Sequence, residues 1–295
     1  MNSLLTFIKR RPVAAYFVLT FAITWGGMLI VFSQAGMPPS DEQFDRLAPF
    51  AYMAMLAGPS ISGLAMIGLV SGHAGFRELL SRLSAWRVSA RWYAMALLIA
   101  PLSLSSVILT LSVLSPEFSR DVFVPDNLIA LLLTGIAVGL VVGLFEEIGW
   151  TGFAIPRLRL QYGIVITGLT IGILWGAWHF PVWWTEDSFS GVLPMAVLLG
   201  GLFAWIPAFR VMMVWVYDRS GSLLVIVLMH ASLLATQLYL VAPLELSARY
   251  TLTHIVVWAG VLWLLVAVVL LVKRWQVRRP GAPEMAPDKM QQAPQ

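Results

Sequence analysis

The sequence predicts an all-α, polytopic membrane protein with about eight transmembrane helices. Of its 295 residues, 59% are hydrophobic and only 12% are charged. Soluble domains carry roughly 25% charged residues, so this composition excludes a water-soluble globule. The apolar residues gather in runs of about 20, the length that an α-helix needs to cross the hydrocarbon core of a bilayer.

Eight apolar runs are long enough to be membrane spans, and polar or basic segments separate them. The expected spans are residues 13–33, 48–70, 93–115, 128–155, 163–184, 191–216, 222–242 and 252–272.

The basic residues orient these spans. With a cytoplasmic N-terminus, sixteen of the 19 Lys and Arg residues lie on the cytoplasmic side, and Arg46, Arg120 and Arg249 lie on the other. This count treats Arg210 as part of the loop after the sixth span. The positive-inside rule then predicts that both termini are cytoplasmic. We expect the protein to lie in the plasma (inner) membrane. Basic residues spread over short loops do not form a nucleic-acid surface.

Four regions follow from this reading. Residues 1–127 hold the first three spans and an interfacial helix, expected at 76–92 because Arg there alternates with Leu and Trp at helical spacing. Residues 128–242 form the core, in which Pro156 is expected to end or kink the fourth span. Residues 243–279 hold the last span. The Pro-, Gln- and Ala-rich residues 280–295 are expected to be disordered.

Glu146 and Glu147 lie side by side in the otherwise apolar fourth span, residues 128–155. A charged side chain in the centre of a membrane costs roughly 2.5–3.5 kcal/mol on insertion scales. Such residues usually face a protein interior and serve a function. The pair therefore marks a candidate functional site.

Two histidines in other spans are candidate partners of this pair: His179 in the fifth and His230 in the seventh. A glutamate in apolar surroundings can take a proton from a water molecule that attacks a carbonyl carbon. Histidines can orient the water, stabilise the oxyanion or bind a metal. The residues thus predict hydrolysis, with Trp175 and Ser232 as supporting residues beside the histidines.

Other protease classes fit less well. The chain has no cysteine, which excludes thiolate catalysis and cysteine-based metal sites. Neither His179 nor His230 begins a His-Glu-x-x-His metalloprotease motif. Ser60 and Ser62 lie in a stretch of small residues that is typical of helix packing. Asp218 is better explained as a loop residue than as half of an aspartyl pair.

These motifs resemble the CPBP family of intramembrane proteases, also called the Abi or type II CAAX prenyl endopeptidase-like family. The resemblance covers about residues 128–240. It implies that Glu146 activates water, that His179 is its partner and that His230 stabilises an oxyanion or binds a metal. The matching motifs are Glu146-Glu147 with Pro156-Arg157-Leu158, Trp175-x-x-x-His179-x-Pro181, and Gly221-Ser222-Leu223 leading to His230-Ala231-Ser232.

Two positions depart from the family pattern, which has Arg at the place of Thr151 and Asn at the place of Leu234. In a helix, an Arg four residues after Glu147 could pair with it. Here Glu147 must instead hydrogen-bond Thr151, reach another cation such as Arg157, or be protonated. Leu234 removes a polar group from the expected oxyanion site.

The resemblance implies an intramembrane endopeptidase that acts on a membrane-embedded or lipidated peptide in the bilayer. Glu146, His179 and His230 could hold a divalent metal such as zinc, and mechanisms with and without metal stay open. Two alternatives also stay open: a proton-coupled transporter that uses the glutamates as a relay, and a catalytically weakened membrane scaffold, as the residues at 151 and 234 suggest.

Overall fold

The computed structural model describes residue 6 and residues 8–118, 128–238 and 246–277. These residues form a helical bundle, which confirms the all-α, polytopic membrane architecture. Six stretches are long and apolar enough to cross a membrane. The expected fifth and seventh spans form shorter apolar helices, Ile164–Trp178 and Leu223–Thr236. The long stretches are Pro12–Val31, Glu42–Leu83, Ala90–Leu114, Ile129–Arg159, Val192–Ser220 and Ala248–Leu271.

The helices follow one another through short connections. The tail expected to be disordered, residues 280–295, lies outside the described residues. The elements are α2 (Pro12–Val31), α3 (Asp41–Leu83), α4 (Ala90–Leu114), η1 (Pro116–Phe118), α5 (Leu128–Gly149), η2 (Trp150–Ala154), α6 (Ile155–Arg159), α7 (Ile164–Trp178), α8 (Phe180–Trp183), η3 (Glu186–Phe189), α9 (Val192–Phe203), α10 (Ile206–Ser220), α11 (Leu223–Thr236) and α12 (Ala248–Val277).

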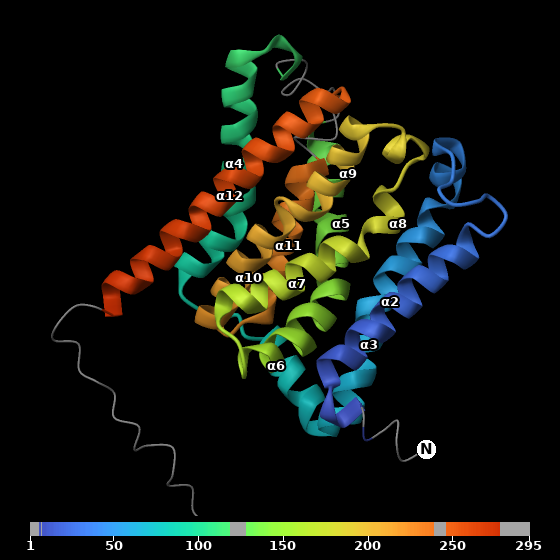
Figure 1. The fold of residues 1–295 in the computed structure, drawn as a ribbon. Helices are drawn as coiled ribbons and strands as arrows, with labels where there is room; N and C mark the ends of the chain where they lie inside the picture. The colour runs from blue at the N-terminus through green and yellow to red at the C-terminus, as the bar shows by residue number, and fades with distance from the viewer. Residues whose placement is uncertain (1–5, 7, 119–127, 239–245, 278–295) are drawn as a thin grey trace, which may run out of the picture.

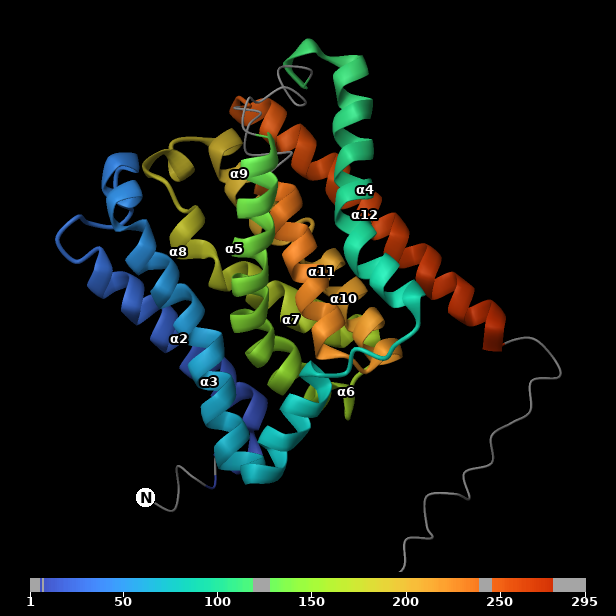
Figure 2. The ribbon, with the colours of Figure 1, turned by 180° about the vertical axis from the view of Figure 1, so that it is seen from behind.

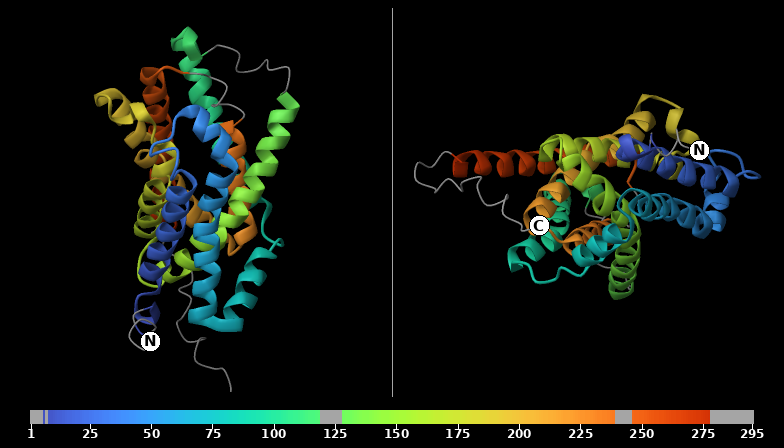
Figure 3. Two further views of the ribbon diagram at one scale, coloured as in Figure 1. Left: turned by 90° about the vertical axis from the view of Figure 1, so that its right-hand side faces the viewer. Right: turned by 90° about the horizontal axis from the view of Figure 1, so that it is seen from below.

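The helices form a central group with two flanks (Figure 1). Helices α5, α7, α10 and α11 lie in the middle, and the α2–α3 pair flanks them on one side. Helices α4 and α12 cross on the other side, as the view from behind shows (Figure 2). Seen from below, α12 and the α2–α3 pair lie at opposite ends of the bundle (Figure 3). The central group is therefore shielded on both sides.

Helices α5 and α11 approach closely because small residues line their contact. A Cβ atom added to Gly139 would lie only 2.6 Å from the backbone oxygen of Ala231. Gly135 and Gly143, one turn away on either side, face α11 in the same way. Small residues allow such backbone contact in membrane bundles. Glu147 is the next residue at this four-residue spacing, so the tight contact leads directly to one of the two candidate carboxylates.

The segment expected to be an interfacial helix is only partly helical. Helix α3 bends at Gly72, where φ is 57°, and continues to Leu83. A non-helical stretch then leads to Ala90, where α4 begins. The expected helix over residues 76–92 therefore ends about halfway along its length.

The fourth span breaks earlier than the sequence suggests. Helix α5 ends at Gly149 and continues as the π-helical turn η2, whereas Pro156 lies in the first turn of α6. Proline is tolerated in a first turn because the N–H that it lacks has no intrahelical partner there. The prediction that Pro156 itself breaks the helix is therefore wrong by several residues.

Two arginine side chains hold the carbonyl groups of η2. Arg82 Nη2 donates to the Gly152 oxygen at 3.3 Å, and Arg157 Nη1 donates to the Phe153 oxygen at 3.0 Å. A π-helical turn leaves the regular α-helical hydrogen-bond pattern, so partners from outside the helix stabilise it. Such turns are frequent at functional sites, and this one directly follows the two glutamates.

Candidate active site

Glu147 is the most completely bonded residue of the site, and its side chain is fully buried. Arg210 Nη1 lies 3.0 Å from both carboxylate oxygens. His230 Nδ1 lies 2.8 Å from Oε1, and the Thr151 hydroxyl donates to Oε2. A cation with two further hydrogen bonds is the environment that stabilises a buried carboxylate anion. Of the alternatives left open for Glu147, the hydrogen bond from Thr151 is therefore present.

The cation beside Glu147 is Arg210 and not Arg157. The Arg157 guanidinium binds the Phe153 oxygen and the Ser71 hydroxyl instead. Arg210 is 0% exposed and belongs to α10. Counting it among the cytoplasmic loop cations was therefore wrong, because its side chain points into the bundle and pairs with a carboxylate.

Glu146 has a different set of neighbours. Its Oε2 accepts hydrogen bonds from the indole N–H of Trp175 at 2.8 Å and from that of Trp150 at 3.3 Å. Within the described part of the chain, its Oε1 has no hydrogen-bond partner, and the residue is only 3% exposed. The indoles hold one oxygen of Glu146 and leave the other available.

His230 connects the two carboxylates. Because Nδ1 faces the ion-paired Glu147 at 2.8 Å, that nitrogen carries the proton. Nε2 then faces Glu146 Oε2 at a distance of 4.0 Å, too long for a direct hydrogen bond. A gap of this size between two polar atoms suits one bridging water or one substrate atom.

Trp175 lies at the centre of the cluster. Its ring centroid is 5.4 Å from that of His179 and 5.2 Å from that of His230, both in edge-to-face geometry. The Arg210 guanidinium carbon lies 4.1 Å from the same ring's centroid, within the range of a cation–π interaction. Trp175 therefore contacts Glu146, Arg210 and both histidines.

The Trp175 side chain lies between His179 and Glu146 and contacts both. His179 Nδ1 is 2.8 Å from the Trp175 backbone oxygen, at the end of α7. The His179 ring packs against Trp178 and Trp183, at centroid distances of 4.8 and 5.5 Å. The structure brings His179 to the cluster through Trp175, without a hydrogen bond to Glu146 among the described residues.

Ser232 and Leu234 lie apart from the polar cluster. The Ser232 hydroxyl donates to the backbone oxygen of Leu97 on α4, at 2.9 Å. Leu234, at the place of the family's Asn, is half-buried and carries no polar group. Ser232 therefore does not take over a role beside the glutamates.

The residues expected to hold a metal do not fit one. Among the described residues, no three His, Asp or Glu side chains are arranged to hold a metal ion. The Nδ1 atoms of His179 and His230 face a backbone oxygen and Glu147, so only their Nε2 atoms are open to other ligands. We therefore derive no chemical step through a metal at Glu146, His179 and His230.

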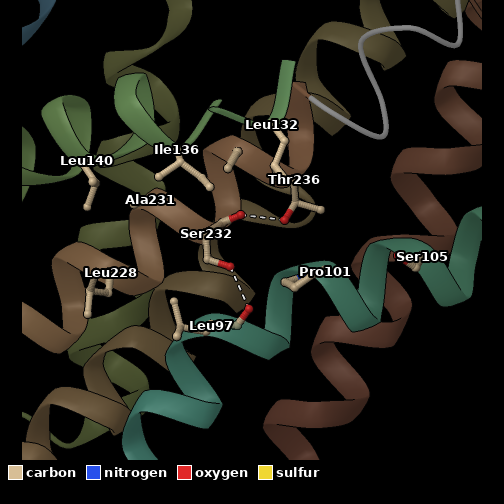
Figure 4. Close-up of a pocket in the computed structure, with 11 residues that line it drawn as sticks. Leu97, Pro101, Ser105, Leu132, Ile136, Leu140, Leu228, Ala231, Ser232 and Thr236 are labelled. Atoms are coloured by element: carbon tan, nitrogen blue, oxygen red, sulfur yellow. Dashed lines mark hydrogen bonds between the residues drawn. The ribbon is translucent and has the colours of Figure 1, made fainter. Parts of the chain in front are cut away.

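An apolar cavity lies between α4, α5 and α11 (Figure 4), and none of the residues of the polar cluster line it. Its volume is about 510 Å³. The Ser232 and Thr236 hydroxyls at its wall are bonded to backbone oxygens, so they offer little to a polar ligand. Its lining residues are Leu97, Pro101, Ser105, Leu132, Ile136, Leu140, Leu228, Ala231, Ser232, Ala235 and Thr236.

The sequence did contain a signal for Arg210. It is the one charged residue in the expected span 191–216. An ionisable residue in a span usually pairs with another one in the bundle interior, and the two glutamates are the obvious candidates. Assigning Arg210 to the adjoining loop hides this pairing with the glutamates.

Comparison with known proteins finds similarity in the part of the chain that holds the cluster. Residues 128–236 match the family model described as Type II CAAX prenyl endopeptidase Rce1-like. The chain is also 29% identical to CAAX prenyl protease 2 of Methanococcus maripaludis, in a match that covers 28% of this chain and 33% of that protein. The match spans about a third of the curated relative's length. Glu146, Glu147, Trp175, Arg210 and His230 all lie within the residues of the family match.

Proposed function

We propose that this chain, which belongs to the Rce1-like type II CAAX prenyl endopeptidase (CPBP) family, is an intramembrane endopeptidase that hydrolyses a peptide bond with water activated by Glu146. The observation that carries the proposal is the asymmetry of Glu146. Two indole N–H groups hold its Oε2, its Oε1 has no hydrogen-bond partner among the described residues, and His230 Nε2 lies 4.0 Å from Oε2.

In the proposed reaction, Glu146 takes a proton from the water as the water oxygen attacks the scissile carbonyl carbon. The tetrahedral intermediate collapses when the C–N bond breaks, and the proton on Glu146 passes to the leaving nitrogen. The products are a new carboxyl terminus and a new amine. The low-dielectric site strengthens every electrostatic interaction in these steps.

In the proposed reaction, His230 contacts the reacting atoms through Nε2, because its Nδ1 is hydrogen-bonded to Glu147. As a neutral imidazole, Nε2 accepts a hydrogen bond from the attacking water. A ring that already carries a proton on both nitrogens before water attacks instead donates from Nε2 to the oxyanion and keeps that proton. His179 supports this arrangement from behind Trp175, through the ring contact at 5.4 Å.

The proposed substrates are membrane-embedded or lipidated peptides, presented in the plasma (inner) membrane. The apolar cavity of about 510 Å³ between α4, α5 and α11 supports an apolar ligand. The names of the family and of the matched relative suggest a peptide with a prenylated CAAX sequence. The experiments below therefore use a fluorescence-quenched prenylated CAAX peptide, with the unprenylated peptide beside it.

The decisive experiment compares wild type with Glu146→Ala in membranes and in purified form. Membrane proteomics should find peptides that are cleaved only by the wild type. In water enriched in ¹⁸O, their new carboxyl termini should carry one ¹⁸O atom, because the attacking oxygen comes from water.

Glu78→Ala is the matched control, since Glu78 is an exposed glutamate on α3. It should cleave as the wild type does. Full activity of Glu146→Ala would refute the proposed mechanism.

A further inference from the structure

Arg210 stands out in the polar cluster because no other Lys or Arg is buried among the described residues. One of its nitrogens, Nη1, lies 3.0 Å from both oxygens of Glu147. The pair joins α10 to α5, across 63 positions of sequence. Resting on the function proposed above, we propose that Arg210 is a positioning residue that fixes the carboxylates of Glu146 and Glu147, and that the reaction needs a cation beside Glu147.

The first connection runs through Glu147 to His230. With Glu147 held by Arg210, its Oε1 faces His230 Nδ1 at 2.8 Å. This bond fixes the ring orientation, so that Nε2 faces Glu146. Without the cation, Glu147 would lose the charge partner that keeps it in place, and His230 would lose a defined orientation.

The second connection runs through Trp175 to Glu146. The guanidinium carbon lies 4.1 Å from the indole centroid, and the indole N–H donates to Glu146 Oε2 at 2.8 Å. One side chain therefore contacts the groups that orient both glutamates. A planar guanidinium can pair with a carboxylate and stack on an aromatic ring together, whereas lysine's ammonium cannot stack in this way.

The backbone around Arg210 is held close to the helix that carries Trp175. A Cβ atom added to Gly172 on α7 would lie 2.5 Å from the Cα of Pro207, and one added to Gly168 would lie 2.5 Å from the Cα of Val211. Arg210 is flanked by these two contacts on α10. The position of its guanidinium over Trp175 thus follows from tight α7–α10 packing.

Arg210 is not arranged for stability alone. Its Nε and Nη2 are buried and have no hydrogen-bond partner within the described residues. A buried ion pair with unsatisfied donors contributes less to folding than a fully bonded one. Retention of such a group inside a membrane bundle fits a role in the site.

Substitution at Thr151 can test whether the site needs a positive charge beside Glu147 or needs Arg210 itself. Its hydroxyl donates to Oε2 of Glu147, the same carboxylate that Arg210 binds. An arginine at position 151 would therefore start from a place already in contact with Glu147. In the Arg210→Met background, the smaller Met leaves space for this longer side chain.

The test measures kcat and KM for wild type, Arg210→Met, Arg210→Lys and the double variant Thr151→Arg/Arg210→Met, with the prenylated CAAX peptide in liposomes. Arg210→Met should lower kcat about 100-fold, the effect of a misplaced catalytic group, while KM changes less than about threefold. Arg210→Lys should retain more activity, and the double variant should recover at least about tenfold over Arg210→Met. Arg219→Met, an exposed position on the same helix, should behave as wild type.

Each outcome decides between the possibilities. Cleavage by Arg210→Met at the wild-type kcat overturns the inference and leaves the proposed function intact. Loss of kcat that neither Arg210→Lys nor the relocated arginine restores, in variants that purify in a folded form, also overturns it. Absence of Glu146-dependent cleavage by the wild type overturns both the inference and the proposed function.

Discussion

The surroundings of Glu146 and Glu147 differ sharply, although the two residues are neighbours in sequence and in depth. Glu147 has a cation at 3.0 Å, a histidine at 2.8 Å and the Thr151 hydroxyl. Glu146 has two neutral indole donors, both on one oxygen. Fully bonded groups are suited to hold other groups in place, whereas a partly bonded one can react. In the proposed mechanism, this difference gives Glu146 the reacting role and Glu147 the role of holding other groups in place.

The comparison predicts that Glu146→Gln has the largest effect on activity. Glutamine keeps the size and the hydrogen bonds to Trp175 and Trp150, but it cannot take a proton from water. We expect kcat to fall by about 1,000-fold or more, within the usual range for a lost general base. The unfolding temperature in detergent should stay equal or rise, because a buried charge is removed without breaking an ion pair. Equal kcat values for Glu146→Gln and the wild type would contradict the reacting role of Glu146.

Compared with Glu146→Gln, Glu147→Gln should lose less activity and more stability. It leaves the fully buried Arg210 without its charge partner. Breaking a buried pair costs about 3–5 kcal/mol of unfolding free energy. Activity should fall about 100-fold through the misplaced His230.

Thermal unfolding of the four proteins in a double-mutant cycle with Arg210→Met measures the coupling. The double variant should be more stable than Glu147→Gln alone. Additive changes in stability would mean that the two residues do not form the pair described above.

Trp175→Phe tests the indole side of the comparison and should have an intermediate effect. Phenylalanine keeps a ring beneath Arg210 but removes the N–H that donates to Glu146 at 2.8 Å. Loss of one such bond is worth about 1 kcal/mol, or about five- to tenfold in kcat. Trp178→Phe is the matched control, because the Trp178 N–H donates to Thr24 and not to Glu146. Equal losses in both variants would contradict the role assigned to Trp175.

Much of the site was readable from sequence because each residue breaks a local pattern. Glu146, Glu147 and His230 are ionisable residues in apolar spans, and that anomaly is visible without coordinates. The structure brings all three together. Arg210 needed one further step, namely recognising that two buried acids in one span call for a buried cation in another.

Other features depend on tertiary contacts that no local pattern carries. The π-helical turn lies where Arg82 of α3 and Arg157 of α6 donate hydrogen bonds to its carbonyl groups. The direction of Ser232 depends on where α4 packs against α11, since its hydroxyl binds the Leu97 oxygen. Helix existence could thus be predicted from hydropathy, whereas helix breaks and side-chain partners could not.

The smallest predicted effect concerns the apolar cavity, which contacts the same helix as the glutamates but holds no charged group. Ile136 lines it, about 15 Å along α5 from Glu146 at 1.5 Å per residue. Ile136→Trp should fill part of the space and lower kcat/KM for the prenylated peptide about fivefold, or about 1 kcal/mol, by raising KM. Leu133→Trp, on α5 outside the cavity lining, is the matched control and should cleave normally. A fall in kcat without a change in KM would mean that the cavity affects the carboxylates rather than substrate binding. That outcome would contradict the separation of the chain into a reacting region and a binding region.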